Sequence, residues 1–518
     1  MELNTFSVHR EKIKANARTQ VTFDEDYNLP DYKPDFSNLI ISQGSVRVEE
    51  VKVTKGHVSV KGTLKFEILY RAEQAQLGVN SLEGSIGFQE TLAADEAQEF
   101  DSARVNCELE DLSISMTNSR KLGIRALLDL SAEVSEFVTE DFPAGMEKDQ
   151  SAEVKNRKVN CLQLKGEGKD QCRIHEEIEL PANKPNIQEL LWKQVQLQGQ
   201  QTRCMEEKIQ IKGEIALFLL YIGEPDTRLE WYEARIPVMC ELEVPGADSD
   251  DICYIRSEVQ EWNVQGQEDL EGEQRLIAID GLMKADYRLY KEEEKEMLED
   301  LYALDRMLIP QKETVGLEHL LMKNESRCKV SDTLSLEEGK KEILQICSCF
   351  GQVQIDHTQI IDEGILVEGA VYVQILYFTK EDRVPLDAAE GMLPFSYKVE
   401  VPGMKKEYRF EMDTRLELLS VMMKSSSMLE LQAVTDFDVI VFVPEYLDKI
   451  SGVTEEELNW EDLQKQPGMI GLRTKKGDTL WDIAKENHTT IDEIRKTNQI
   501  PEEPLAEGTV ILILKQVR

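Results

Sequence analysis

The fold is decided by a stretch that occurs three times: VKGTLKFEILY at residues 60–70, IKGEIALFLLY at residues 211–221 and VEGAVYVQILY at residues 367–377. Apolar residues alternate with polar or small ones, which is the period of a half-buried β-strand. The inward positions are Val60, Leu64, Phe66, Ile68 and Tyr70, then Ile211, Ile215, Leu217, Leu219 and Tyr221, then Val367, Val371, Val373, Ile375 and Tyr377. Because such a strand is longer than most, the glycine in each copy predicts a bend or a bulge.

The repetition covers whole domains. The glycines Gly62, Gly213 and Gly369 are 151 and 156 residues apart, and an upstream Leu-Pro-x-x-Lys-Pro motif at Leu29 recurs at Leu180. A closing strand is predicted to begin at Leu122, Leu276 and Leu429. Alternating segments separated by Gly, Pro and Asp predict a mainly β protein of three repeated antiparallel β-sandwich or barrel-like domains. Their predicted bounds are residues 1–145, 146–300 and 301–445.

Three other segments favour helices. Residues 186–194 carry Ile187, Leu190 and Leu191 at helical spacing, which predicts one short helix in each unit. Residues 291–307 are rich in charge and predict a helical spacer. Residues 446–468 are acidic and lose the alternation, so they predict a linker with one short helix.

The C-terminal residues 469–516 form a separate module. A short strand leads to Gly477, and Asp478 or Thr479 is placed to cap a helix. Thr490-x-x-Glu493 is a capping box that opens a second helix, and residues 510–514 form a last strand. The order β-α-α-β within about 45 residues predicts a small domain with a limited core.

The motif Lys-Gly-Asp-Thr-Leu-Trp at residues 476–481, followed by Asn498-x-Ile500 and Gly508, resembles a LysM domain. The resemblance implies binding of N-acetylglucosamine-containing glycans such as peptidoglycan or chitin, in a shallow groove between two loops. The groove would be lined by Gly477, Asp478, Thr479, Leu480, Asn498, Gln499, Ile500 and Pro501. Taken singly, these residues also suit a turn, a cap or a core, and the module could dock a protein instead of a glycan.

Composition excludes several classes of function. The chain has 60 Lys and Arg against 99 Asp and Glu, a net charge of −39, which disfavours nucleic-acid binding. The longest apolar run, residues 216–222, is far shorter than the roughly 20 residues of a membrane-spanning helix. The first residues lack a signal-peptide pattern, and the nine cysteines are odd in number, so we expect mostly reduced, packed thiols.

The sequence contains no recognisable catalytic motif. The six histidines show no metal-ligand spacing, and neither a nucleophile elbow nor a phosphate-binding glycine loop occurs. Carboxylates are too abundant for an acid and base pair to be singled out. We expect no enzyme activity, no cofactor and no metal site.

The three units followed by LysM resemble the spore-coat-associated repeat (SPOCS) proteins of spore-forming Firmicutes. The resemblance rests on the Leu-Pro-x-x-Lys-Pro motif and on the glycine-bearing strand that ends in Leu-Tyr. It implies a non-enzymatic scaffold or adaptor in spore coat assembly, in the mother-cell cytoplasm at the forespore surface. The implied partners are the spore-coat morphogenetic ATPase and other coat proteins. The alternatives are a wall-associated protein that binds peptidoglycan or another N-acetylglucosamine glycan through LysM, and, less favoured, a cell-wall hydrolase.

Overall fold

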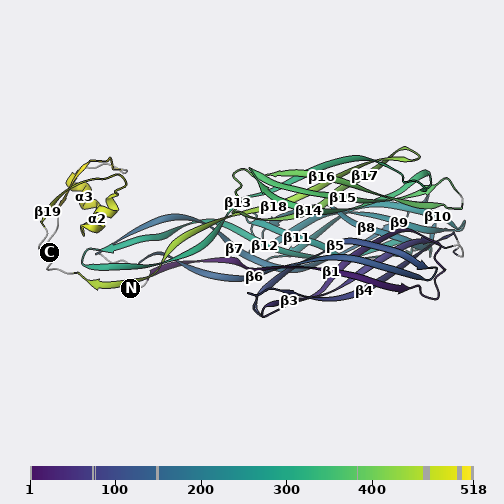
Figure 1. The fold of residues 1–518 in the computed structure, drawn as a ribbon, viewed down its shortest axis with the longest axis horizontal. Coiled ribbons are helices and arrows are strands. Elements are labelled where there is room, and N and C mark those ends of the chain that lie inside the picture. The colour runs from purple at the N-terminus through teal and green to yellow at the C-terminus, as the bar shows by residue number, and fades with distance from the viewer. Residues whose placement is uncertain are drawn as a thin grey trace.

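The computed structural model describes residues 3–72, 75, 77–146, 151–381, 383–458, 467–498 and 505–514. The chain is 78% strand and 3% helix, which confirms the predicted mainly β class. Figure 1 shows an elongated molecule with three β units at one end and a small domain with two helices at the other.

Each of the three units contains six strands. Unit 1 has β1 (Leu3–Asn28), β2 (Asn38–Thr54), β3 (His57–Arg71), β4 (Val79–Ala93), β5 (Ser102–Asn118) and β6 (Lys121–Met146). Unit 2 has β7 (Ala152–Glu179), β8 (Asn186–Met205), β9 (Lys208–Glu224), β10 (Arg228–Glu243), β11 (Ile252–Glu268) and β12 (Gln274–Ala303). Unit 3 has β13 (Arg306–Ser335), β14 (Ile343–Ile361), β15 (Gly364–Thr379), β16 (Leu386–Glu400), β17 (Arg409–Ser425) and β18 (Met428–Glu457).

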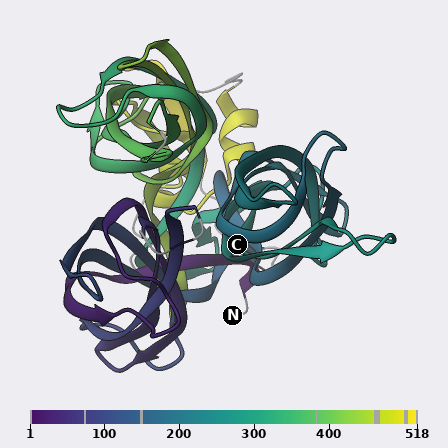
Figure 2. The ribbon, with the colours of Figure 1, turned by 90° about the vertical axis from the view of Figure 1, so that its right-hand side faces the viewer.

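The same topology recurs in every unit. In unit 1 the strands form two antiparallel sheets with orders β1-β6-β5 and β2-β3-β4, and the other units repeat this arrangement. The two sheets pack face to face, and seen end-on each unit encloses its own core (Figure 2). The glycine-bearing stretches are the central strands β3, β9 and β15, as their alternation predicts.

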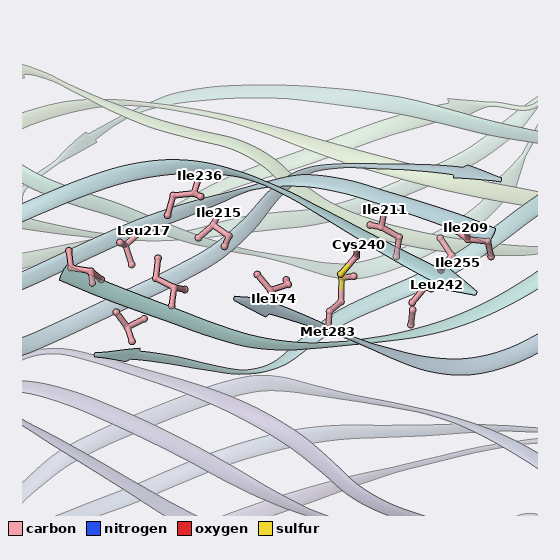
Figure 3. Packing of buried hydrophobic residues seen from close by; sticks show 14 of the residues in the cluster. Ile174, Ile209, Ile211, Ile215, Leu217, Ile236, Cys240, Leu242, Ile255 and Met283 are labelled. Atoms are coloured by element: carbon pink, nitrogen blue, oxygen red, sulfur yellow. The ribbon is translucent and has the colours of Figure 1, made fainter. Parts of the chain in front are cut away.

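The core of each unit is built from the predicted inward residues. Val60, Leu64, Phe66, Ile68 and Tyr70 are all buried, as are their counterparts in units 2 and 3. Figure 3 shows part of the core of unit 2, where Ile211, Ile215 and Leu217 of β9 face the second sheet. Burial of aliphatic side chains at alternate positions on both sheets is the main stabilising contribution here.

The repeated glycine accommodates a bulge in the neighbouring strand. The pairing of β2 with β3 slips between Val48 and Glu50, opposite Gly62. A Cβ atom at Gly62 would lie 2.6 Å from the carbonyl oxygen of Arg47, so only glycine fits there. The predicted bulge is therefore present, but it lies in the strand that faces the glycine.

Unit 2 contains a disulfide that the sequence did not predict. Cys172 of β7 and Cys240 of β10 are bonded, with their Cα atoms 6.1 Å apart, and the bond joins the two sheets. The other seven cysteines are free. The expectation of reduced thiols was wrong for this pair, because two positions 68 residues apart in sequence meet only through the sandwich.

The first and last strands of each unit are much longer than the sandwiches they enter. They contain 26 to 30 residues, and their paired ends, β1 with β6, β7 with β12 and β13 with β18, extend beyond the units. These ends pack together into a stalk, visible as the narrow part of Figure 1. The apolar side chains that hold the stalk together come from all three units: Val8, Phe142, Val159, Cys161, Met297, Val315, Leu317 and Leu447.

The three units also meet each other directly and form a three-lobed head around a common axis (Figure 2). One apolar cluster joins Ile40, Ile41 and Leu69 of unit 1 to residues of the other two units. Its other members include Leu191, Trp192 and Phe218 of unit 2 and Cys347, Phe350 and Leu376 of unit 3. The head is therefore one packed body.

Three local predictions were wrong. Residues 186–194 begin strand β8, where Leu190 packs into the core of unit 2 while Leu191 and Trp192 pack between units. Both faces of this strand are covered, so its consecutive apolar residues imitate a helical pattern. Residues 291–303 are strand, and residues 306–307 begin the next one, so no spacer helix exists there. Residues 446–457, predicted as linker, continue β18, and residues 459–466 lie outside the described part of the chain.

The small terminal domain has the predicted β-α-α-β order. It contains β19 (Met469–Arg473), α2 (Leu480–Glu486), α3 (Ile491–Asn498) and β20 (Val510–Leu514), with β19 and β20 antiparallel. Its core comprises Leu480, Trp481, Ile483, Ala484, Ile494, Ile511 and Ile513. In the part of the chain that the structure describes, no helix is long and apolar enough to cross a membrane.

Candidate functional site

The predicted glycan-facing turn lies before helix α2. Gly477 has φ +99°, which allows the chain to reverse before the helix. The carboxylate of Asp478 accepts a hydrogen bond from the backbone N–H of Lys475 at 2.8 Å. Thr479 is the N-cap, because its hydroxyl oxygen accepts from the backbone N–H of Asp482 at 3.1 Å.

A second loop is tied to this turn by backbone and side-chain hydrogen bonds. The N–H of Gly508 donates to the carbonyl oxygen of Thr474 at 2.8 Å, and the hydroxyl of Thr474 donates to the carbonyl oxygen of Ala506 at 2.8 Å. The structure therefore holds the exposed residues 475–477 and the half-buried Asp478 and Thr479 close to residues 506–508.

Other predicted groove residues have structural roles. Leu480 is fully buried in the domain core. The side-chain amide of Asn498 donates to the carbonyl oxygens of Ile494 at 2.8 Å and Leu512 at 2.7 Å, and its oxygen accepts from the N–H of Leu512 at 2.6 Å. Both amide hydrogens are therefore used within the domain. Gln499, Ile500 and Pro501 lie outside the described residues.

The domain rests on the tip of the stalk through helix α2. The rings of Tyr302, on β12, and Trp481 stand edge to face with centroids 4.9 Å apart. The Tyr302 hydroxyl donates to the carbonyl oxygen of Thr489 at 2.9 Å. Asp300 accepts from the indole N–H of Trp481 at 2.8 Å and from the Lys485 ammonium at 2.7 Å. These contacts fix the domain on the stalk.

Ionisation favours this docking contact. Burial opposes ionisation of Asp300, but the hydrogen bonds from Lys485 and Trp481 outweigh it and lower the pKa of the carboxyl group. Asp300 and Tyr302 were missed as functional residues, because they lie in the segment interpreted as a spacer helix. Within the described residues, no hydrogen bond or ion pair joins the turn 475–479 to the three units.

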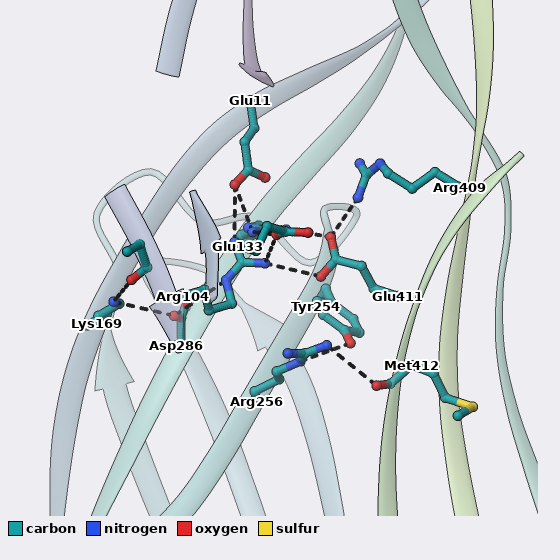
Figure 4. A network of polar contacts seen from close by, with 12 residues as sticks. Glu11, Arg104, Glu133, Lys169, Tyr254, Arg256, Asp286, Arg409, Glu411 and Met412 are labelled. Carbon is teal, nitrogen blue, oxygen red and sulfur yellow. Dashed lines mark hydrogen bonds and ion pairs between the residues drawn. The ribbon is translucent and has the colours of Figure 1, made fainter. Parts of the chain in front are cut away.

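A second polar site lies where the three units meet (Figure 4). Ala94, Val244 and Val401 hold the same place in the three units, because each donates its N–H to the turn between the second and third strands of its unit. Ten residues after them lie Arg104, Tyr254 and Glu411, which therefore occupy equivalent positions. The repeats thus place a cation, a phenol and a carboxylate at one position in three units.

The charges of this junction are paired between units. Arg288 of unit 2 binds Glu11 of unit 1 at 2.9 Å and Glu411 of unit 3 at 2.6 Å. Arg104 also binds Glu11, at 3.2 Å, and Glu133 at 3.0 Å. The side chains of Glu11, Arg288 and Glu411 are only 4%, 3% and 7% exposed, so each depends on the others for charge compensation.

The pKa values of two carboxyl groups of the junction shift in opposite directions. For Glu133, burial and the nearby Glu411 and Glu11 raise the pKa to about 7. For Glu411, burial is outweighed by Arg288, Arg409 and Arg256, which lower its pKa. The described part of the chain contains no group of three or more His, Cys, Asp or Glu side chains placed to hold a metal ion.

Comparison with protein families gives two matches. The family described as "SipL, SPOCS domain" matches residues 35–117, 186–266 and 342–424, and the family described as "LysM domain" matches residues 473–513. The three SPOCS matches span β2–β5, β8–β11 and β14–β17, so the long strands that form the stalk lie largely outside them. The chain has no significant match among curated proteins or among solved structures.

The fold and the docked terminal domain thus define a class of modular repeat proteins in which β-sandwich units carry a LysM domain. More specifically, the chain contains three SPOCS domain repeats and a C-terminal LysM domain.

Proposed function

We propose that this protein is a non-enzymatic scaffold that links partners in spore coat assembly. The observation that carries the proposal is its two-ended shape, with a three-lobed SPOCS head at one end of a stalk and a LysM domain fixed at the other (Figure 1). At about 3.3 Å per residue, the 30 residues of β12 span roughly 100 Å. A scaffold of this length separates the partners that its two ends bind.

The stalk gives the LysM domain a defined direction. Because Trp481 and Lys485 are engaged with Asp300, helix α2 faces the stalk. The turn 475–479 has no such contact among the described residues, which supports its use in binding. Several interfaces on one rigid body favour tight assembly without one strong site, since a second contact forms at high effective concentration.

Charge supports a basic or cation-bridged partner for the head. Residues 470–518 contain eight Lys and Arg and eight Asp and Glu, so the net charge of −39 belongs to residues 1–469. Long-range attraction speeds the encounter with a positively charged partner. We infer that the partners include the spore-coat morphogenetic ATPase and other coat proteins, met in the mother-cell cytoplasm at the forespore surface.

A pull-down with the full chain from sporulating cells tests this function. We expect recovery of coat proteins with the wild type and loss of some of them with Tyr302→Ala, which frees the LysM domain. Tyr446→Ala is the matched control, because Tyr446 is a stalk tyrosine with 76% of its surface exposed. Recovery of no coat protein would contradict the scaffold proposal.

Glycan binding by LysM is the second candidate function, favoured by the exposed turn around Gly477. Titration of the full chain with chitin or peptidoglycan oligomers tests it. Binding that is lost in Gly477→Val and Asp478→Ala but kept in Lys424→Ala, at an exposed position on the head, supports a glycan site. No heat change at millimolar ligand favours protein docking by LysM. Zymography on purified cell wall checks the absence of hydrolase activity.

A further inference from the structure

The three contacts between neighbouring units can be compared position by position. Five residues after the repeated glycines lie Glu67, Phe218 and Gln374, and each faces the next unit around the axis. Leu29, Leu180 and Leu336 are equivalent, because each donates its N–H to the carbonyl oxygen of a residue adjacent to the first residue of the last strand of its unit. Fourteen residues after them, the facing strands β2, β8 and β14 carry Gln43, Gln194 and Phe350 at equivalent positions. The three contacts between units can therefore be compared at the same pair of positions.

At two of these contacts, the side chains at the equivalent positions interact directly with the neighbouring unit. Between units 2 and 3, the rings of Phe218 and Phe350 pack edge to face with centroids 5.7 Å apart. Between units 3 and 1, the side-chain amide of Gln374 donates to the carbonyl oxygen of Ser42 at 3.1 Å. The first contact uses both positions defined by the repeat, and the second uses Gln374 and the residue that precedes Gln43.

The contact between units 1 and 2 instead contains a cavity. It has a volume of about 260 Å³ and is lined by Glu67 of β3, Gln194 of β8 and Gln260 of β11. A smaller cavity of about 70 Å³, lined by Trp192, adjoins it and shares Glu67 and Lys193. Together they slightly exceed the roughly 300 Å³ at which small-molecule sites begin.

Three buried polar atoms in the walls have no hydrogen-bond partner within the described residues. They are the indole Nε1 of Trp192 and the side-chain oxygens of Gln194 and Gln260. Trp192 is only 3% exposed, so its N–H cannot be satisfied by bulk water. The site thus offers one donor and two acceptors, and leaving such groups unpaired is costly.

Most charged groups around the cavity are paired with an opposite charge, whereas Glu67 bonds to a neutral amide and burial raises the pKa of its carboxyl group. Glu67 accepts from the side-chain amide of Gln43 at 2.9 Å, and Lys193 pairs with Glu83 at 3.2 Å. Glu261 pairs with Arg47 at 2.9 Å and with Lys65. What remains for a ligand is uncharged hydrogen bonding, together with the apolar surfaces of Val195, Val259 and Val264.

We propose that these two adjoining cavities together bind a small neutral polyhydroxy molecule of the size of one sugar unit. A hydroxyl group both donates and accepts, so one ligand can satisfy the Trp192 N–H and both glutamine oxygens. Its C–H groups pack on the valine side chains, as is common in small-molecule sites. This site is separate from the LysM groove and lies in the head, between units 1 and 2.

Saturation-transfer NMR on the full-length protein, with D-glucose and N-acetylglucosamine as probes at millimolar concentration, tests the proposal. We expect transfer to at least one probe, and about threefold to tenfold weaker binding in Trp192→Phe, which removes the N–H donor together with part of the ring. Gln194→Phe introduces the residue found at the equivalent position 350. It should fill the cavity, abolish binding and leave the melting temperature unchanged or higher.

Two controls separate this site from others. Gln374→Leu weakens the contact between units 3 and 1, outside the cavity, and should leave binding unchanged. Gly477→Val alters the LysM turn and should also leave it unchanged, while a signal lost in Gly477→Val belongs to LysM and contradicts the proposal. Absence of transfer to both probes, or equal transfer in wild type and a folded Gln194→Phe, would show that the cavity holds water only.

Discussion

Tyr302 at the tip of the stalk stands edge-on to Trp481 of the LysM domain, with ring centroids 4.9 Å apart and an interplanar angle of 71°. This contact joins the last strand of the second SPOCS unit to a domain that begins about 165 residues later in the chain. The stalk therefore connects the units and also binds the LysM domain at its tip.

Tyr302→Ala is expected to release the LysM domain from the stalk. The substitution removes an aromatic pair of about 0.5–1.5 kcal/mol, a hydrogen bond to Thr489 and buried apolar area. Nuclear relaxation of LysM amides should then show faster tumbling than that of the head. Tyr446→Ala should leave the relaxation unchanged, and unchanged relaxation in Tyr302→Ala would mean that other contacts suffice.

Asn498→Ala should destabilise the LysM domain without affecting the head. Its side chain makes one hydrogen bond to Ile494 within α3 and two to the backbone of Leu512 in β20, and the substitution removes both bonds that join α3 to β20. We expect the free energy of unfolding of the LysM domain to fall by about 1–3 kcal/mol, measured as faster exchange of LysM amide hydrogens with deuterium. Lys476→Ala, at an exposed position in the same domain, is the control. Equal rates of amide exchange in both variants would show that the hydrogen bonds of Asn498 do not stabilise the domain.

Arg288→Met should strongly destabilise the head. It leaves Glu11 and Glu411 buried, and Glu411 keeps only its pairs with Arg409 and Arg104. Removing one partner of a buried ion pair typically costs about 3–5 kcal/mol. Chemical denaturation measures the loss, and Arg125→Met at the exposed surface should change little. Adding Glu11→Gln and Glu411→Gln to Arg288→Met should recover part of the stability, and no recovery would argue against charge as the cause.

Glu133 should make the stability of the head fall as pH rises. Its pKa is raised to about 7 in the folded protein against about 4.5 in the unfolded chain. The folded state therefore binds more protons between these values, and stability decreases as pH passes from about 4.5 to 7. In Glu133→Gln this decrease should be smaller by an amount on the order of 1–3 kcal/mol, measured by denaturation at several pH values.

Glu140 provides a control, because its pKa shift is opposite in sign to that of Glu133. Burial opposes its ionisation, but hydrogen bonds from Lys449 and Arg10 lower its pKa in the stalk. Its contribution is present above its unfolded pKa and is lost as pH falls, so Glu140→Gln should lower stability near neutral pH. If both variants shift the pH dependence in the same direction, the assignment of the raised pKa to Glu133 is wrong.

The cysteines give a direct chemical test of unit 2. The disulfide between Cys172 and Cys240 leaves seven free thiols out of nine cysteines. Thiol titration of the denatured, unreduced protein should find seven thiols, rising to nine after reduction. Cys240→Ser should leave Cys172 reactive. Nine thiols before reduction would mean that the pair is reduced in the isolated protein.

The strand pattern and the LysM motif were predictable because both depend on local order. Alternation through Val60, Leu64 and Phe66 requires one buried face, and the turn before Thr479 requires glycine and a cap whatever the rest of the chain does. Asn498 was predicted to line the binding groove. In the structure its side chain forms hydrogen bonds with the backbone of Leu512 within the domain. A sequence pattern does not show which hydrogen-bonding partner a buried amide will meet.

Local order along the chain determined the β class, the threefold repetition and the small terminal domain, because side-chain period and turn chemistry act over a few residues. Tertiary structure alone decided that the long strands leave their sandwiches to form a stalk, and that Leu191 and Trp192 lie in a strand covered on both faces. It also decided the pairing of Arg288 with Glu11 and Glu411. These features depend on which distant surfaces exclude water from each other, and no short stretch of sequence contains that information.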